Sequence, residues 1–425
     1  MEIMDSLIVF QIIYQFTNLT PWSINRKGWI FQRSRILEAY CVAVILVSVV
    51  VLLYGLFSKN AITTINSNDI GKTVDFIQLV GIRVAHIVSI AEALIRREEQ
   101  KKFYQQLIEI DKIFEKSLNI DLNNGKFHSS TAKSGLLILC VYIISEVFIL
   151  IAHLISYENE NFQIYWIFYL VPLLICGLRY FQTFTSIRLI QKRLNELIKL
   201  LNEINLHKPP KEVEAEQAEK EKDSLYKSLA PFKISDTHST FSLLELSLHK
   251  RQEMENTDMK KLLIVRDLYN RLFLLTEIFN RYFGVSMLIN LGNDFISITS
   301  NCYWIFINFK TFASTTKNFL QIAGSTVWFI PHVLNVLVLA ILCDKTMGCT
   351  TNMALGLHRI HIDTFNDNHN SVIQQFSLQL LHQKIIITAA GFFTIDCSLL
   401  YAIVGATTTY LIILIQFHLN EELDS

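Results

Sequence analysis

Long runs of apolar residues alternate with short polar segments along most of the chain. Each run has about 18 residues or more, which is enough to cross a bilayer as an α-helix. The pattern therefore predicts an all-α integral membrane protein with seven transmembrane helices. The runs lie at 36–57, 73–95, 134–156, 162–187, 283–307, 325–342 and 391–418.

The segments between these runs differ in length and in character. Residues 1–35 form an N-terminal segment whose apolar piece is too short to span. The long loop 188–282 has a charged, Pro-containing middle, which is typical of a flexible segment. Its end becomes helical from about residue 259, where apolar residues recur every three or four positions. Residues 343–390 read as a loop followed by an anchor helix, and 419–425 as a polar tail.

Basic residues mark one side of the predicted membrane. Lys and Arg gather in the N-terminal segment and in the loops after the second, fourth and sixth spans. The positive-inside rule then predicts a cytoplasmic N-terminus and an extracellular C-terminus. The sequence Asn18-Leu19-Thr20 is an N-glycosylation sequon, which we expect to stay unmodified on the cytoplasmic side. No cleaved signal peptide is predicted, so the first span should direct insertion.

Composition agrees with a membrane protein and excludes several functions. The 425 residues are 51% hydrophobic and only 18% charged, against about 25% charged in soluble proteins. A net charge of zero gives no reason to expect a nucleic-acid partner. The seven Cys residues form no CxxC pair, and no Walker A, HExxH or GxSxG motif is present. We therefore predict no enzyme activity and no cofactor. His358, His361 and His369 could form a metal site, but solvated surface histidines are the favoured interpretation.

Polar and aromatic residues inside the spans predict a ligand pocket. The predicted topology places seven of them in the outer half of the membrane. A carboxylate and imidazoles can bind hydroxyl groups, and aromatic rings can pack on apolar C–H surface. The alternative is an aromatic belt with buried helix–helix hydrogen bonds. Asp294 favours the pocket, because an ionisable residue within a span is commonly functional. The candidate ligand-binding residues are Asp294, Trp328, His332, Tyr165, Trp166, Tyr169 and His153.

Arg83, His86 and Glu146 are expected nearer the membrane centre. Asp75, Arg83, His86 and Glu92 lie in the second span and should face the bundle interior, water or a headgroup layer. We expect Arg83 to form a salt bridge with Glu146 of the third span.

One face of the last span is small or polar. Gly405, Thr409, Ile412 and Gln416 follow one another at steps of three or four residues and so share a face. The segment also carries a motif: Thr409-Tyr410, five hydrophobic residues, then Gln416-Phe417. With the preceding run 389–396, it resembles the C-terminus of insect gustatory receptors. A purely structural role in helix packing is the alternative explanation for the Thr and Gln residues.

The resemblance implies a ligand-gated cation channel of the plasma membrane of chemosensory neurons. Four subunits, identical or mixed, would each contribute the last span to one central pathway, with cytoplasmic helices as the anchor region. The implied conducted ions are monovalent cations and some calcium, and the implied ligand is a small-molecule tastant, either a sugar or a bitter compound. The pore and gate residues would be Gln416, Phe417, Ile413, Ile412 and Thr409, with Tyr410 completing the motif.

Two other functions fit seven spans. A G-protein-coupled receptor is disfavoured by the orientation, and by the lack of Asp-Arg-Tyr after the third span and of Asn-Pro-x-x-Tyr in the seventh. A secondary transporter would be supported by inverted repeats and broken helices at matched positions, which the sequence does not show.

Overall fold

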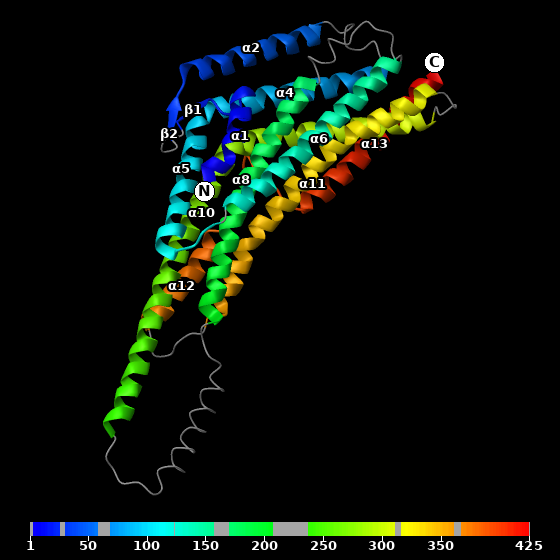
Figure 1. Ribbon diagram of the computed structural model, residues 1–425. Helices are drawn as coiled ribbons and strands as arrows, with labels where there is room; N and C mark the ends of the chain where they lie inside the picture. Colours follow the sequence, from blue (N-terminus) through cyan, green and yellow to red (C-terminus); the bar gives the residue numbers. More distant parts are fainter. Residues whose placement is uncertain are drawn as a thin grey trace.

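The computed structural model describes residues 3–25, 30–57, 69–122, 124–156, 170–206, 237–310, 316–360 and 367–424. Within these ranges the protein is built of helices, with two small antiparallel hairpins (Figure 1). The helices are α1 (Ile3–Phe16), α2 (Arg35–Phe57), α4 (Asp69–Ile95), α5 (Arg97–Leu118), α6 (Asn124–Ser156), α8 (Val171–Leu206), α10 (Thr237–Lys310), α11 (Thr316–His358), α12 (Asp367–His382) and α13 (Ser398–Asp424).

The hairpins join helices at two places. Strands β1 (Trp22–Asn25) and β2 (Ile30–Arg33) lie between α1 and α2. Strands β3 (Thr388–Ala389) and β4 (Phe393–Thr394) lie between α12 and α13. The turn between β3 and β4 has positive φ at Ala390 and Gly391, 53° and 80°. This turn sets the direction in which the chain enters the last helix.

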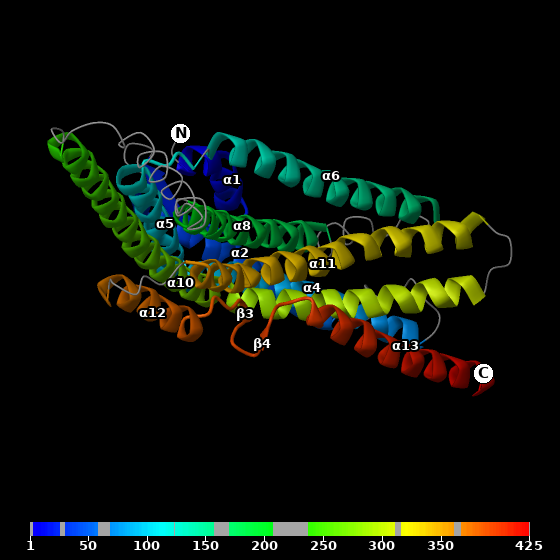
Figure 2. The ribbon, with the colours of Figure 1, turned by 90° about the horizontal axis from the view of Figure 1, so that it is seen from below.

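Six of the described helices are long and apolar enough to cross a membrane. They contain the predicted first, second, third, fifth and sixth spans and residues 398–418 of the predicted seventh span, because α13 begins at Ser398. Most of the predicted fourth span falls in α8, although its first residues, 162–169, lie outside the described part of the chain. Figure 2 shows α4, α6, α10 and α11 running side by side along the bundle, with α13 along its edge.

The loop predicted to begin at residue 343 is wrong over its first part, because α11 continues to His358. Polar residues such as Asp344 and Lys345 suggested a loop from sequence. They are exposed, whereas Thr346, Met353 and Leu357 are buried at helical spacing. The extension is therefore an amphipathic helix with its apolar face on the core.

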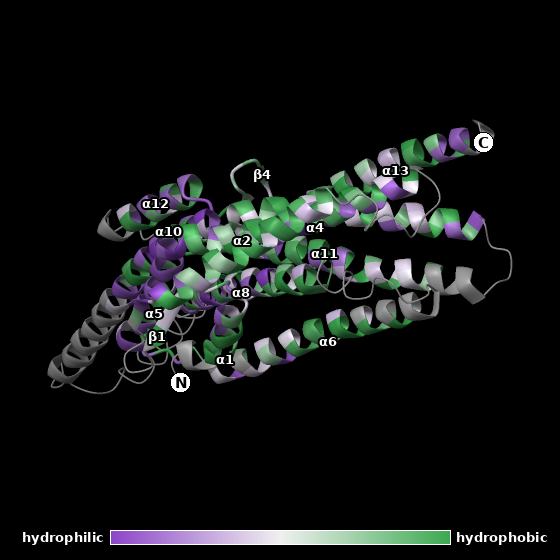
Figure 3. Ribbon diagram, turned by 90° about the horizontal axis from the view of Figure 1, so that it is seen from above, coloured by the Kyte–Doolittle hydropathy of each residue, from purple (hydrophilic) through white to green (hydrophobic). Residues whose placement is uncertain are grey.

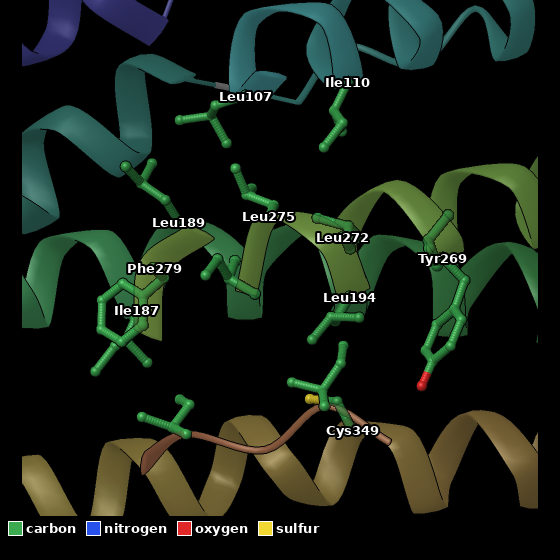
Figure 4. Packing of buried hydrophobic residues seen from close by; sticks show 14 of the residues in the cluster. Leu107, Ile110, Ile187, Leu189, Leu194, Tyr269, Leu272, Leu275, Phe279 and Cys349 are labelled. Carbon is green, nitrogen blue, oxygen red and sulfur yellow. The ribbon is translucent and has the colours of Figure 1, made fainter. Parts of the chain in front are cut away.

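A hydrophobic core holds α5, α8, α10, α11 and α12 together at the end of the molecule opposite the C-terminus (Figure 1). Leu107 of α5, Leu194 of α8 and Leu272 of α10 are each fully buried in it, as Figure 4 shows. The helical spacing predicted from residue 259 is confirmed: Leu262, Val265, Leu268, Tyr269 and Leu272 all have no exposed surface. Helix α10 passes from this core into the fifth span without a break in the chain's helical course.

Candidate ligand pocket and pore helix

Asp294 joins three helices at the centre of the bundle. It lies on α10 and is buried. One carboxylate oxygen lies 2.7 Å from Nδ1 of His332 on α11, and the other accepts a 2.5 Å hydrogen bond from the hydroxyl of Tyr180 on α8. A buried carboxylate requires such partners, because leaving it unpaired would cost several kcal/mol. The structure therefore brings predicted residues Asp294 and His332 together and adds Tyr180.

Aromatic side chains lie beside this polar group. Trp328 precedes His332 by one turn of α11, and their ring centroids are 6.2 Å apart. One turn beyond His332, the amide of Asn335 exchanges hydrogen bonds of 3.0 and 2.7 Å with the hydroxyl of Tyr142 on α6. Rings and hydrogen-bonding groups thus share one buried region between α6, α8, α10 and α11.

Several buried polar atoms in this region have no hydrogen-bond partner among the described residues. They include Nε2 of His332, Oδ1 of Asn290, Oδ1 of Asn293, Oγ of Ser297 and both ring nitrogens of His86. Buried polar atoms are normally satisfied by protein, ordered water or a ligand. These side chains of α4, α10 and α11 can therefore supply both donors and acceptors to a small polar molecule or to water.

Other predicted pocket residues cannot be placed in this way. Tyr165, Trp166 and Tyr169 lie outside the described residues, and His153 lies on α6 with its side chain outside them. The side chain of Glu146 is likewise outside the described part, so its pairing with Arg83 stays a prediction. Of the predicted pocket residues, the structure therefore describes the side chains of Asp294 on α10 and of Trp328 and His332 on α11.

A buried ion pair that the sequence did not predict lies one to two turns along α10 from this region. Nη2 of Arg179 on α8 lies 3.1 Å from Oε2 of Glu92 on α4, and both side chains are almost fully buried. Arg179 also donates to Ser286 Oγ at 3.0 Å and to Gln182 Oε1 at 2.8 Å, and its guanidinium lies 4.6 Å from the ring centroid of Tyr282. The feature of the sequence that could have indicated this pair is Arg179, an arginine inside the apolar run 162–187.

This ion pair also binds backbone groups of α10. The N–H of Ser286 donates to Glu92 at 2.8 Å, and the carbonyl of Tyr282 accepts from Arg179 at 3.1 Å. The N–H of Val285 also donates to Glu92, at 2.9 Å. The ion pair therefore ties α4 and α8 to the backbone of α10.

Helix α13 begins with a cap and packs on the bundle by one face. Asp396 accepts hydrogen bonds from the N–H and hydroxyl of Ser398, and the pKa of its carboxyl is lowered because these bonds favour the charged form. Further along, Thr407 and His418 are buried, and His418 Nδ1 lies 3.2 Å from the hydroxyl of Tyr303 on α10. Leu411 and Leu414 pack against the same cluster.

The opposite face of α13 is open. Positions 407, 411, 414 and 418 are two residues out of step with 405, 409, 412 and 416, which places the two sets on opposite sides of a helix with 3.6 residues per turn. Phe417 is 59% exposed and Ile412 51% exposed. All the predicted pore and motif residues are exposed: Thr409, Tyr410, Ile412, Ile413, Gln416 and Phe417.

Comparison with solved structures defines the class of fold. The fold is similar to that of the insect olfactory receptor OR5 from Machilis hrabei, with a TM-score of 0.63, 13% sequence identity and 97% of each chain covered. The structure of the same receptor in complex with eugenol is also similar, with a TM-score of 0.57. At this identity the likeness concerns the fold alone, which is an all-helical fold like that of OR5.

Sequence comparison narrows this class to a family. A family profile described as 7tm Chemosensory receptor matches residues 6–421. The putative gustatory receptor 2a of Drosophila melanogaster is 40% identical, with 98% of each chain covered. The putative gustatory receptor 28a of the same species is 24% identical over 78% of this chain and 73% of its own length. The chain therefore belongs to the insect gustatory receptor family, whose members are chemosensory receptors rather than enzymes, as the sequence predicted.

Proposed function

We propose that the chain is a subunit of a ligand-gated, non-selective cation channel that a small-molecule tastant opens. The observation that carries this proposal is the orientation of α13. Its Gly405, Thr409, Ile412 and Gln416 stripe faces away from the subunit's own bundle, where another subunit or water must meet it. A lipid-facing helix gains nothing from Thr or Gln at these positions, whereas a pore-lining helix does.

The pore would form from the α13 helices of four subunits, identical or mixed. Phe417 rings near the outer end would block ions by excluding water, and the amide oxygens of Gln416 would replace part of a cation's hydration shell. This stripe of α13 carries no carboxylate. Such a pathway should pass monovalent cations with little selection, together with some calcium.

The ligand would bind in the outer half of the bundle, around Asp294, His332 and Trp328. Support comes from the buried polar atoms that have no partner among the described residues and from the rings beside them. The similar olfactory receptor has been solved with eugenol, so this fold can hold a small molecule. A sugar and a bitter compound both suit a site with rings, a carboxylate and amides.

A cytoplasmic N-terminus and an extracellular C-terminus complete the proposal. The distribution of Lys and Arg supports this topology. The sequon at Asn18 is consistent with a cytoplasmic N-terminus, because Asn18, Leu19 and Thr20 are all buried in the fold and leave no room for a glycan. A glycan attached to Asn18 would prevent that packing, so a glycosidase-sensitive mass on Asn18 would contradict both the topology and the fold.

The function is tested by expressing the chain alone in cells and recording current during application of a tastant panel, without nucleotide in the pipette. A cation current that persists in excised membrane supports the channel. A response that requires intracellular GTP would support the G-protein-coupled alternative. Uptake of a labelled tastant without ionic current would support a transporter. In either of the last two cases the channel proposal fails.

The pocket is tested with Asp294→Ala at matched surface expression. Without its carboxylate, His332 and Tyr180 lose their shared partner, and the agonist response should be abolished. Asp267→Ala is the control, because Asp267 is an exposed acid on the same helix whose salt bridge with Arg271 lies outside the pocket. An unchanged dose response in Asp294→Ala would remove Asp294 from the site.

A further inference from the structure

The C-terminal part of α13 is fastened to α10 by a buried pair of polar side chains. His418 of α13 has 2% of its surface exposed, and Tyr303 of α10 has none. Nδ1 of His418 lies 3.2 Å from the Tyr303 hydroxyl, and the two rings meet edge to face with centroids 5.9 Å apart. Burial of polar groups is costly unless they are hydrogen-bonded, so each residue stabilises the buried position of the other.

Tyr303 is itself fixed by residues of two helices. The ring of Trp304 meets that of Tyr303 edge to face, with centroids 5.2 Å apart. Nε1 of Trp304 donates a 2.9 Å hydrogen bond to Oδ1 of Asp75 on α4. Val74 of α4 and Ile307 of α10 are buried in the same apolar cluster as Tyr303. The group that holds the end of α13 therefore belongs to both α4 and α10.

This pair adjoins the proposed gate. Phe417 directly precedes His418, and Gln416 lies two residues before it. Successive residues of an α-helix point about 100° apart, so residues 416 and 418 lie on nearly opposite sides of α13. Phe417 is 59% exposed, whereas His418 is buried. The burial of His418 therefore sets which side of α13 turns Gln416 and Phe417 away from the subunit's own bundle.

Apolar contacts on the same side of α13 set its rotation less strictly than this hydrogen bond does. Leu411 and Leu414 pack against the cluster around Tyr303. Apolar packing is non-directional, whereas a hydrogen bond requires both a short distance and a suitable angle. The contact between His418 and Tyr303 thus gives the end of α13 a defined orientation.

We propose that His418 is a positioning residue of the gate. Through its hydrogen bond with Tyr303 it fixes the rotation of α13 and holds Phe417 at the pore axis while no agonist is bound. This inference rests on the proposed pore. A constriction that excludes water requires the Phe417 rings of all the subunits to meet at the axis. Rotational freedom at the end of α13 separates these rings, so loss of the hydrogen bond lets ions leak.

The same helix carries the proposed ligand site and the partner of His418. Asp294 and Tyr303 are nine residues apart on α10, which is about 14 Å along the helix axis. Helix α10 is continuous between them. A displacement of α10 at Asp294 therefore reaches Tyr303 and, through it, the end of α13.

The first measurement is the agonist-free current of the full-length chain in cells, normalised to surface expression. His418→Phe keeps a ring of similar size but cannot form a hydrogen bond with Tyr303. It should raise this current about threefold to tenfold, the factor that one net hydrogen bond contributes to an equilibrium. His418→Asn places an amide at the position of Nδ1 and should keep the current at the wild-type level.

The partner residue gives an independent variant. Tyr303→Phe should raise the agonist-free current as His418→Phe does, and the double variant should raise it no further, because both changes remove one interaction. Tyr40→Phe is the matched control, since it removes a tyrosine hydroxyl from the exposed face of α2. That variant should leave the current unchanged.

The second measurement does not require conduction. In a Cys140→Ser background, Gln416→Cys should cross-link neighbouring subunits under mild oxidation. Adding His418→Phe should lower the cross-linked fraction about threefold or more, whereas adding His418→Asn should not. The thermal midpoint of each purified variant is recorded in parallel, because a purely structural role of the pair would lower the midpoint alone.

The outcomes separate the positioning role from the proposed pore. If His418→Phe does not raise the current or does not lower the cross-linked fraction, the positioning role is overturned. A lower thermal midpoint with both quantities unchanged would overturn it as well, since the pair would then only stabilise the fold. If Gln416→Cys never cross-links on its own and no variant conducts, the proposed pore itself fails, and this inference fails with it.

Discussion

At the scale of single residues, Asp294 shows what a sequence can reveal about a membrane site. An acid within an apolar run indicated a buried functional group, and the structure satisfies both of its oxygens. His332 was predicted for the same pocket because the predicted topology places both residues in the outer half of the membrane. Tyr180 was not predicted, because a tyrosine in a span has several roles and only the packing of α8 on α10 selects this one.

Tyr180→Phe tests the carboxylate's environment while preserving the aromatic ring. Loss of the hydroxyl should leave one buried carboxylate oxygen unsatisfied, which costs about 1–3 kcal/mol. We expect a thermal midpoint lower by several degrees in detergent, measured by the unfolding of purified protein. Tyr401→Phe is the control, since Tyr401 is 83% exposed and should leave the midpoint unchanged. Equal midpoints for both variants would show that the 2.5 Å contact contributes nothing.

At the scale of elements, hydrophobic patterning predicted the existence of most helices but not their ends. Polar residues in α11 face solvent on an amphipathic helix, so a rule that equates polarity with loops failed there. The buried ion pair could not be predicted, because Glu92 and Arg179 come from different helices and pair only through the packing of α4 and α8 on α10. Residue depth alone suggested a different pairing, between Arg83 and Glu146, which stays a prediction.

Breaking the buried ion pair should destabilise the bundle. Glu92→Gln leaves Arg179 buried and charged against α10, and removal of one partner of a buried pair costs about 3–5 kcal/mol. Surface expression and the monodisperse fraction after purification should both fall. Glu92→Gln combined with Arg179→Met should recover much of both, because no unpaired charge remains. Glu196→Gln, which removes an exposed pair worth about 0–1 kcal/mol, should have little effect.

A substitution at Gly284 tests the contact between α10 and the hairpin that leads into α13. A Cβ at this position would lie 3.0 Å from the backbone N and Cα of Ala390, so either the helix or the turn must shift. Gly284→Ala should therefore change gating, seen as an altered basal current or agonist midpoint at unchanged surface expression. Gly348→Ala on α11 is the matched control, because a Cβ there meets nothing within 4 Å. Identical currents in both variants would show that this contact does not affect gating.

At the scale of the whole molecule, two zones of different polarity are joined by continuous helices. Figure 3 shows hydrophobic residues along α2, α6 and most of α13, whereas α5, α12 and the adjoining part of α10 are largely hydrophilic. Because α10 and α11 run through both zones, a displacement at Asp294 or His332 can reach the core that supports α12 and the hairpin before α13. An agonist that binds one arrangement of these helices better would shift the population toward it.

The open face of α13 makes a prediction about assembly. If four copies of this face surround a pore, Gln416→Cys residues of neighbouring subunits should approach one another and form disulfides under mild oxidation. In a Cys140→Ser background, which removes an exposed native thiol, the variant should give a cross-linked dimer on a non-reducing gel. Leu414→Cys is the control, because Leu414 packs against the cluster around Tyr303 of its own subunit.

The outcome distinguishes the pore arrangement from other contacts because the two positions lie on different faces of one helix at nearly the same depth. Cross-linking at Leu414→Cys but not at Gln416→Cys would place the wrong face at the subunit boundary and contradict the proposed pore. Cross-linking at Gln416→Cys should also depend on the gate: if agonist draws the four helices away from the axis, the rate of disulfide formation should fall when agonist is present. A rate that agonist leaves unchanged would keep the assembly but remove the movement of α13 from the gating scheme.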